Sequence, residues 1–283
     1  MATFTNQATL IYNGQSTSSN VTTGEILSGL TLTKTAIDGT YTRDGRVAYI
    51  VTITNAGGAV SGATLTDDLG AYAVGLNTVY PLSYLEGTLL YYQNGTEASG
   101  ATAAGGPPLV ITGIDIPAGG NVQLIYEAAT NAYTPYGEGA SVVNTAYLSG
   151  IGVTEPLSDN ATVTPAVDVA LTIAKAICPA VISDDGTLTY TFIIQNAGNA
   201  AVAATDNLTV TDTFNPILNP IEVTLNGTAL TEGTGYTYDE TTGEFATLPG
   251  VITVPAATYT QDPTTGAYNL TPGVAILTVS GTV

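Results

Sequence analysis

The sequence contains no histidine and no tryptophan, and among its 283 residues it has one cysteine. Without histidine, the Ser-His-Asp and Cys-His forms of nucleophilic catalysis and the commonest zinc ligand are excluded. Cys178 cannot form a disulfide within the chain, and we expect it to be a small buried hydrophobic residue rather than a reactive thiol. We therefore expect no enzyme, no cofactor, no bound metal and no disulfide framework.

Basic residues are also scarce, with four lysines and arginines against 23 acidic residues and a formal net charge of −19. Such a surface repels nucleic acids and anionic membranes, so neither is an expected partner. No run of about 20 apolar residues is present to span a membrane. The N-terminus shows no signal peptide, which leaves the export route open. Acidic clusters such as residues 67–68 and 184–186 lack the spacing of a calcium loop and favour turns.

The abundant residues indicate β-structure. Thr, Val, Ile and Tyr are plentiful, 32 glycines and 14 prolines punctuate the chain, and no long stretch has helical apolar periodicity. Alternating strands separated by short Gly, Asn and Asp turns are typical of an antiparallel sandwich. The length allows two such domains, each with its own core.

An internal repeat supports two domains. Lys34 and Lys175 lie at matching positions, as do Asn55 and Asn196, and the two pairs are equally far apart in the chain. Residues 64–67 (Thr-Leu-Thr-Asp) then match residues 209–212 (Thr-Val-Thr-Asp). A later strand with Val122, Leu124 and Tyr126 resembles one with Val274, Ile276 and Thr278. We predict an all-β fold of two tandem antiparallel Ig-like β-sandwiches, residues 28–167 and 168–283.

The two repeats differ at their ends. The first continues into a strand around Asn144 and another around Asn160, whereas the second stops at Val283 before any such pair. The same two-strand pattern occurs at residues 1–27, where Asn6 occupies the place of Asn144. We predict that residues 1–27 form a connector of donor strands and that residues 168–283 form a sandwich without its closing strands.

An incomplete sandwich exposes an unpaired edge and an apolar groove. Strand addition would fill both, with Phe4, Ala8 and Leu10 forming the inserted face of the donor. The chain could fill its own groove and become a closed, permuted monomer. A neighbouring copy could fill it instead, which repeats head to tail into a filament, and the short tether before the first sandwich favours the neighbour.

Each sandwich also places three polar residues on inward strand positions. Lys34, Asp67 and Asn144 lie inward in the first, and Lys175, Asp212 and Asn6 are predicted to meet in the second. A dry site favours a neutral amine and a protonated carboxyl. The amine can then attack the Asn carbonyl and release ammonia while the Asp shuttles protons, which forms an isopeptide bond.

A simpler interpretation of these residues stays open. Lys34 with Asp67, and Lys175 with Asp212, could be buried ion pairs, which often add little net stability. Asn144 and Asn6 could satisfy backbone groups at an edge or bulge.

The pattern resembles a repeat of bacterial surface proteins known as domain of unknown function eleven. An early strand lysine, the Tyr-x-x-x-Ile-x-Asn-x-Gly strand at residues 49–57, Thr-x-Thr-Asp at 64–67 and Val-x-Asn-x-Ala at 142–146 carry the resemblance. It implies β-sandwiches of cell-wall, S-layer-like or spore-surface proteins, with a Lys/Asp/Asn arrangement similar to isopeptide-forming pilin and adhesin domains. The long array and wall anchor usual in that family are absent from this sequence.

Together these observations predict the structural subunit of an extracellular or cell-surface fibre, a homopolymer whose partner is another copy of itself. The alternative is a surface adhesin or binding module whose loops, such as residues 94–106 and 231–245, recognise a host or glycan ligand. A hydrolase or accessory domain is disfavoured because no nucleophile lies beside a base.

Overall fold

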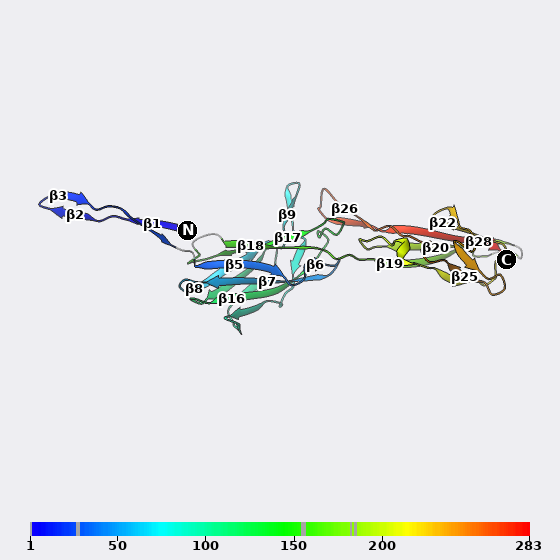
Figure 1. Ribbon diagram of the computed structural model, residues 1–283, viewed down its shortest axis with the longest axis horizontal. Helices are drawn as coiled ribbons and strands as arrows, with labels where there is room; N and C mark the ends of the chain where they lie inside the picture. Colours follow the sequence, from blue (N-terminus) through cyan, green and yellow to red (C-terminus); the bar gives the residue numbers. More distant parts are fainter. Residues whose placement is uncertain (1, 27–28, 154–156, 182, 184–185) are drawn as a thin grey trace. The chain divides into compact units, whose positions relative to one another are not determined.

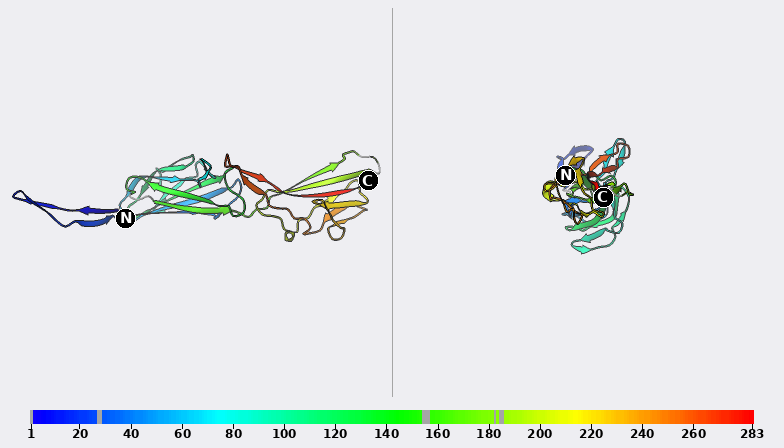
Figure 2. Two further views of the ribbon diagram at one scale, coloured as in Figure 1. Left: turned by 90° about the horizontal axis from the view of Figure 1, so that it is seen from above. Right: turned by 90° about the vertical axis from the view of Figure 1, so that its right-hand side faces the viewer.

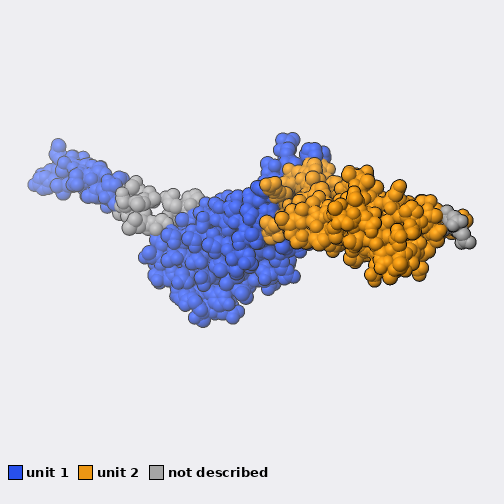
Figure 3. All heavy atoms as spheres, turned by 45° about the vertical axis from the view of Figure 1, so that its right-hand side comes forward, with its two compact units in different colours: residues 1–135, 139–165, 263–267 blue, residues 136–138, 166–262, 268–283 orange. Residues whose placement is uncertain are grey.

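The structure is a computed structural model that describes residues 2–26, 29–153, 157–181, 183 and 186–283 (Figure 1). Almost all regular structure is antiparallel β-strand, and the described residues contain no α-helix, only the 3-10 helix η1 (Ala204–Asp206). The predicted all-β fold class is confirmed. No helix in these ranges is long and apolar enough to cross a membrane. The chain divides into two compact units (Figure 3), residues 1–135, 139–165 and 263–267, and residues 136–138, 166–262 and 268–283.

The N-terminal residues form an extended β-hairpin. Asn13 and Gly14 make its tight turn with φ values of 50° and 79°, as a two-residue hairpin turn requires. Along the hairpin Leu10 pairs with Thr17 and Asn6 with Thr22. The predicted boundary at residues 27–28 lies outside the described residues. The hairpin strands are β1 (Ala2–Asn6), β2 (Thr9–Tyr12), β3 (Gln15–Ser18) and β4 (Thr22–Ile26).

The first sandwich has two six-stranded sheets. One has the order β13-β12-β16-β7-β5, with β11 also paired to β16, and the other has the order β14-β15-β8-β17-β18-β6. The strands of the first sheet are β5 (Leu30–Ala36), β7 (Arg46–Asn55), β11 (Leu82–Tyr84), β12 (Leu90–Gln93), β13 (Thr96–Glu97) and β16 (Asn121–Thr130). Those of the second are β6 (Thr40–Tyr41), β8 (Val60–Asp67), β14 (Thr102–Ala104), β15 (Leu109–Ile116), β17 (Val142–Ser149) and β18 (Leu157–Pro165). The strands β9 (Tyr72–Val74) and β10 (Asn77–Val79) form a separate small hairpin.

The core lies between these sheets because one side chain in two points inward along each strand. Val51 of β7 and Leu124 of β16 are fully buried opposite each other. At the side of the sandwich, β18 lies against β5 (Figure 2), and the Asp159 carboxylate accepts a 2.8 Å hydrogen bond from the Lys34 backbone N–H. The strands β17 and β18 therefore close the sandwich next to β5.

The second sandwich has a five-stranded sheet in the order β19-β20-β28-β22-β23 and a three-stranded sheet in the order β21-β25-β24. The strands β26 (Thr258–Gln261) and β27 (Tyr268–Thr271) form a hairpin. The larger sheet contains β19 (Leu171–Cys178), β20 (Thr187–Asn196), β22 (Ile221–Leu225), β23 (Thr228–Ala229) and β28 (Gly273–Thr282). The smaller contains β21 (Thr211–Thr213), β24 (Tyr236–Tyr238) and β25 (Glu244–Thr247).

Strand pairing confirms the repeat register at the start of each sandwich. Lys34 lies opposite Val51 in the first, and Lys175 lies opposite Phe192 in the second. The turns after β7 and β20 also match, because Asn55 and Asn196 are buried and each amide bridges two backbone carbonyls while its oxygen accepts a glycine N–H.

The predicted register of β28 is wrong by one residue. Tyr126 pairs with Tyr49 in the first sandwich, and Val279, not Thr278, pairs with Tyr190, the counterpart of Tyr49. The sequence match aligned the Pro-Gly turns, but β28 begins at the turn glycine itself, whereas β16 begins after two glycines. The sequence match paired Val122, Leu124 and Tyr126 with Val274, Ile276 and Thr278, whereas the buried residues of β28 are Ala275, Leu277 and Val279.

In the described part of the second sandwich, no strand takes the places of β17 and β18. In the first sandwich β8 pairs with β15 on one side and β17 on the other. Its counterpart β21 pairs with β25 alone. One edge of β21 therefore has no strand partner among the described residues.

Candidate functional site

The first candidate site lies inside the first sandwich, where three strands each contribute one polar residue. Lys34 comes from β5, Asp67 from the end of β8 and Asn144 from β17. Alternation along the strands points all three inward, and the side chains of Lys34 and Asp67 are completely buried, as is Asn144. The structure thus places these predicted residues in one core.

Asp67 is the centre of this site. Its Oδ2 accepts hydrogen bonds from the Lys34 ammonium and the Tyr126 hydroxyl. Its Oδ1 accepts the Leu69 backbone N–H at 3.0 Å. Both carboxyl oxygens are therefore held by groups that are themselves buried.

Lys34 lies in a setting that disfavours its charge. Burial lowers the pKa of Lys34 from its ordinary value, and the attraction of Asp67 acts in the opposite direction. The Lys34 nitrogen also lies 4.7 Å from the centre of the Tyr49 ring, whose electron-rich face interacts with a cation. A lowered pKa increases the population of the neutral amine, which is the nucleophilic form.

Asn144 points into the same core, and both polar atoms of its amide are buried without a hydrogen-bond partner. The same Tyr49 that packs under Lys34 also lies near Asn144. Burial raises the Tyr49 pKa, and the nearby Asn144 amide acts on it in the opposite direction. No well-aligned hydrogen bond joins the two side chains. An unsatisfied buried amide costs free energy, and native cores contain few of them. Asn144 is thus an unusual interior residue, and it shares the neighbour Tyr49 with a lysine whose pKa is lowered.

The second candidate site repeats two of the three residues in a more open setting. The Lys175 ammonium pairs with Asp212 and lies 4.4 Å from the centre of the Tyr190 ring. However, the Lys175 and Asp212 side chains are 40% and 19% exposed. The Asp212 Oδ1 accepts the N–H of the next residue, Thr213, at 2.9 Å.

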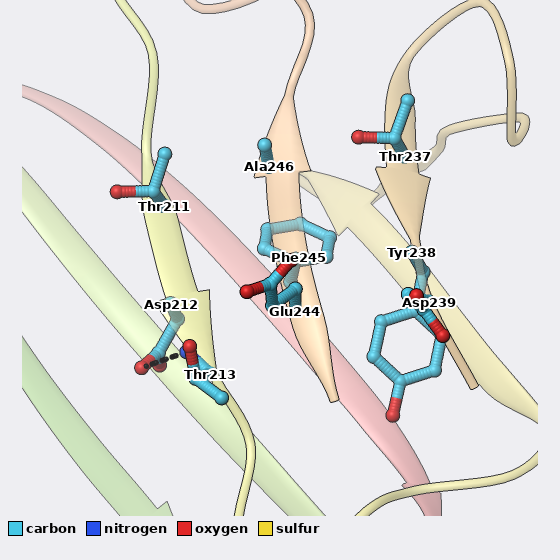
Figure 4. Close-up of a pocket in the computed structure, with 9 residues that line it drawn as sticks. All are labelled: Thr211, Asp212, Thr213, Thr237, Tyr238, Asp239, Glu244, Phe245 and Ala246. Atoms are coloured by element: carbon cyan, nitrogen blue, oxygen red, sulfur yellow. Dashed lines mark hydrogen bonds between the residues drawn. The ribbon is translucent and has the colours of Figure 1, made fainter. Parts of the chain in front are cut away.

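Open space adjoins Asp212. A cavity of about 500 Å³ lies on the three-stranded sheet, and Asp212, Phe245 and Tyr238 line it together with neighbouring residues of β21, β24 and β25 (Figure 4). The second carboxyl is therefore accessible, unlike Asp67.

The predicted third member of the second site lies in the hairpin. Asn6 is exposed there, and its carbonyl accepts the Thr22 hydroxyl at 3.1 Å. The structure therefore brings together Lys175 and Asp212 but does not place Asn6 with them. Ala8 and Leu10 are also exposed in the hairpin, and the side chain of Phe4 lies outside the described part of the structure.

The face of β19 that corresponds to the buried face of β5 is exposed. Leu171 is 38% exposed and Ile173 57% exposed, whereas their counterparts Leu30 and Leu32 in β5 are 6% and 9% exposed. The predicted burial of Cys178 is wrong. Cys178 is the last residue of β19, and every residue of this strand is exposed.

Two residues of the first site were not identified from the sequence. Tyr126 and Asp159 contact Asp67 and the Lys34 backbone, respectively. Tyr126 lies on the inward side of an alternating strand, where a tyrosine cannot be distinguished from an ordinary core aromatic residue. Its buried hydroxyl needs a partner, and that requirement was the available signal.

Comparisons with known proteins give structural neighbours but no family. No protein family model matches the sequence, and no curated protein matches it. The major pilin SpaD from Corynebacterium diphtheriae is 12% identical, with 86% of this chain and 59% of SpaD covered and a TM-score of 0.37. BcpA, the major pilin subunit of Bacillus cereus, is 13% identical, with 96% and 73% covered and a TM-score of 0.38.

The collagen-binding domain of a Staphylococcus aureus adhesin is 14% identical over 48% of this chain and 97% of the domain, with a TM-score of 0.31. The chain spans less than two thirds of the SpaD chain. The resemblance to domain of unknown function eleven stays a prediction.

Proposed function

We propose that this protein is the structural subunit of an extracellular fibre, in which the hairpin of one copy inserts into the second sandwich of the next. The observation that carries the proposal is the uncovered apolar face of β19. In the first sandwich β17 and β18 close the corresponding side, and residues 1–26 match these two strands in sequence. The hairpin of a neighbouring copy is therefore the segment best suited to cover the exposed face of β19.

The first sandwich also supplies a register for the insertion. There Ala146 of β17 pairs with Asp67, and Leu148 pairs with Leu65. Transferred to the free edge of β21, this register pairs Ala8 with Asp212 and extends the ladder to place Leu10 opposite Val210. Backbone hydrogen bonds would supply affinity, and alternate side chains would enter the groove.

The same register would complete the second polar site. Asn144 precedes Ala146 by two residues and points to the same interior. Asn6 precedes Ala8 by two residues, so insertion would carry it to Lys175 and Asp212. Insertion would also cover these partly exposed side chains and produce the dry surroundings of the first site.

We further infer that each complete site forms an isopeptide bond. The neutral lysine amine attacks the Asn side-chain carbon, and a C–N bond forms as the bond from that carbon to the amide nitrogen breaks. The aspartate, Asp67 or Asp212, accepts a proton from the attacking nitrogen and delivers it to the leaving nitrogen, which departs as ammonia. The fixed position of the reacting groups and the low dielectric supply the acceleration.

The two bonds would form at different stages. Lys34 and Asn144 meet within one sandwich, so their bond would follow folding. Lys175 and Asn6 come from different copies, so their bond would follow insertion and convert a reversible contact into a covalent homopolymer. A surface location suits such a polymer because no cofactor or cellular energy source enters the chemistry.

Denaturing electrophoresis after boiling tests this proposal. Wild-type protein should give a ladder of covalent oligomers, and peptide mapping should find Lys175 joined to Asn6. The variants Lys175→Ala and Asn6→Ala should lose the ladder, whereas the matched variant Lys34→Ala should keep it. Asp212→Ala should also lose it.

Two other outcomes would redirect the proposal. Filaments that dissolve completely into monomers would retain donor-strand insertion but remove the covalent bond. Monomers at every concentration, with affinity for a host or glycan ligand, would instead favour a closed surface adhesin.

A further inference from the structure

The two candidate sites differ at one strand position that faces the aspartate. In the first sandwich this position is Tyr126, which is fully buried and donates its hydroxyl to Asp67 Oδ2. In the second sandwich the equivalent position is Val279, which has no polar group. The lysine, the aspartate and a tyrosine ring under the lysine occur in both sites, and the second site adds Phe192 and Phe214 around its lysine.

We propose that Tyr126 is a positioning residue for the Lys34–Asn144 bond, and that it holds the Asp67 carboxyl in the orientation needed for proton transfer. This inference rests on the proposed isopeptide chemistry. It also implies that the second site, with Val279, forms its bond more slowly even after a donor strand is in place.

The contacts of Asp67 explain how this would work. The Leu69 backbone holds Oδ1 at 3.0 Å, and Tyr126 holds Oδ2, the oxygen that faces the Lys34 nitrogen. With both oxygens fixed, the carboxyl cannot rotate away from the amine. The Tyr126 ring is itself held by Tyr49 at 5.8 Å and by Tyr84 at 6.5 Å between ring centres.

A tyrosine hydroxyl suits this position because it can both donate and accept a hydrogen bond. It donates to Oδ2 while Asp67 is ionised, and it can turn to accept when Asp67 carries the proton taken from the amine. Tyr126 neither gains nor loses a proton overall, since the amine proton passes through Asp67 to the departing ammonia. A valine offers neither contact, and Asp212 depends on one backbone N–H and on Lys175.

The test follows loss of ammonia from newly made full-length protein by intact mass spectrometry. All proteins carry Lys175→Ala, so each chain can lose at most one ammonia, at the first site. Samples from a cell-free synthesis reaction are quenched in acid at intervals. Far-ultraviolet circular dichroism and protease resistance on parallel samples report the folded fraction.

Tyr126→Phe removes the hydroxyl and keeps the ring, whereas Tyr84→Phe removes a hydroxyl from the neighbouring ring without removing a donor to Asp67. We expect Tyr126→Phe to slow ammonia loss by about tenfold or more, as loss of a hydrogen bond to a charged group predicts. Tyr84→Phe should match the parent protein. Both variants should fold to the same extent and at the same rate as the parent.

The outcomes separate the inference from the proposed function. Ammonia loss at the parental rate in Tyr126→Phe would overturn the positioning role while the cross-link stands. A rate that falls only in proportion to the folded fraction would also overturn it, because the role would then be structural. A parent that never loses ammonia would overturn the cross-link and, with it, this inference.

Discussion

Lys34 and Lys175 occupy equivalent strand positions, yet they lie in different dielectric surroundings. The Lys34 side chain is completely buried with Asp67, whereas the Lys175 side chain is 40% exposed. Removing a charge from water carries a large cost that an ion pair offsets only in part. Burial in the first site therefore lowers the pKa of its lysine within a single copy, whereas the lysine of the second site keeps contact with water.

This difference predicts an alkaline signature for Asn144→Ala, in which Lys34 keeps a free amine. In the folded protein the Lys34 pKa lies below 10.5, its ordinary value. At pH values between the lowered pKa and 10.5 the unfolded chain therefore binds more protons than the folded protein. The free energy of unfolding rises with pH in that range. The Tyr49 and Tyr126 pKa values are raised above 10. Above about pH 10 the unfolded chain loses those protons first, and stability falls.

Thermal unfolding midpoints measured across this alkaline range check the prediction. With the proposed cross-link, Lys34 of the wild type would be an amide that does not titrate, so the wild type should show the fall above about pH 10 without the preceding rise. Parallel pH profiles for the two proteins would contradict the cross-link in the wild type.

Alternation identified Lys34, Asp67 and Asn144 because polar residues stand out on apolar strand faces, and the structure places all three in the core. Their chemical roles stay predictions. Tyr126 escaped notice because it looks like core, and its role depends on a contact between distant strands. Cys178 was placed wrongly because burial depends on a covering strand that no local pattern reveals.

At the scale of the strand, β5 and β19 show that one pattern can have two environments. Both carry alternating apolar residues around a lysine, and both pair along one edge with the next long strand. Burial differs because β17 and β18 lie beside β5, whereas no strand in the described part of the chain lies at the corresponding side of β19. The apolar residues of β19 therefore contribute less to the stability of a single copy than those of β5.

Substitutions at matched positions should separate these roles. Ile173→Asn replaces a side chain that is 57% exposed, so the free energy of unfolding of the monomer should change by no more than about 0.5 kcal/mol. Fibre formation, followed by electron microscopy, should be lost because a polar group enters the groove. Leu32→Asn at the buried counterpart should cost about 2–5 kcal/mol or more, measured by denaturant unfolding.

Normal fibres from Ile173→Asn would contradict a groove role for β19.

Strands were the most predictable part of the fold, since period-2 patterns and short turns specify antiparallel strands directly. The register of β28 was not predictable in the same way. A sequence match displaced by one residue assigns every side chain of the strand to the opposite face.

At the scale of the whole molecule, the proposed function assigns the hairpin of one copy to the open side of the second sandwich of another. A protein without residues 1–26 should fold, remain monomeric at all concentrations and form no fibres. Electron microscopy and size-exclusion chromatography measure this result. Fibres that resemble the wild type would contradict the donor role.

The missing segment should also act when supplied separately. A synthetic peptide of residues 1–26 should bind the truncated protein, raise its unfolding temperature as a ligand specific for the folded state does, and become attached through Lys175. The same peptide with Asn6→Ala should bind reversibly and leave no covalent product by mass spectrometry.

The position of the first polar site has a consequence under mechanical load. The chain enters the first sandwich at β5 and leaves it after β18, and Lys34 and Asn144 lie on strands close to these two points. A bond between them would let tension pass from β5 directly to β17. The segment between the two residues, which includes β7, β8 and β16, would bear no pulling force and could not lengthen when the fibre is stretched. With the second proposed bond also in place, Lys175 would pass the load to Asn6 of the next copy, and extension would be confined to the segments from Asn6 to Lys34 and from Asn144 to Lys175.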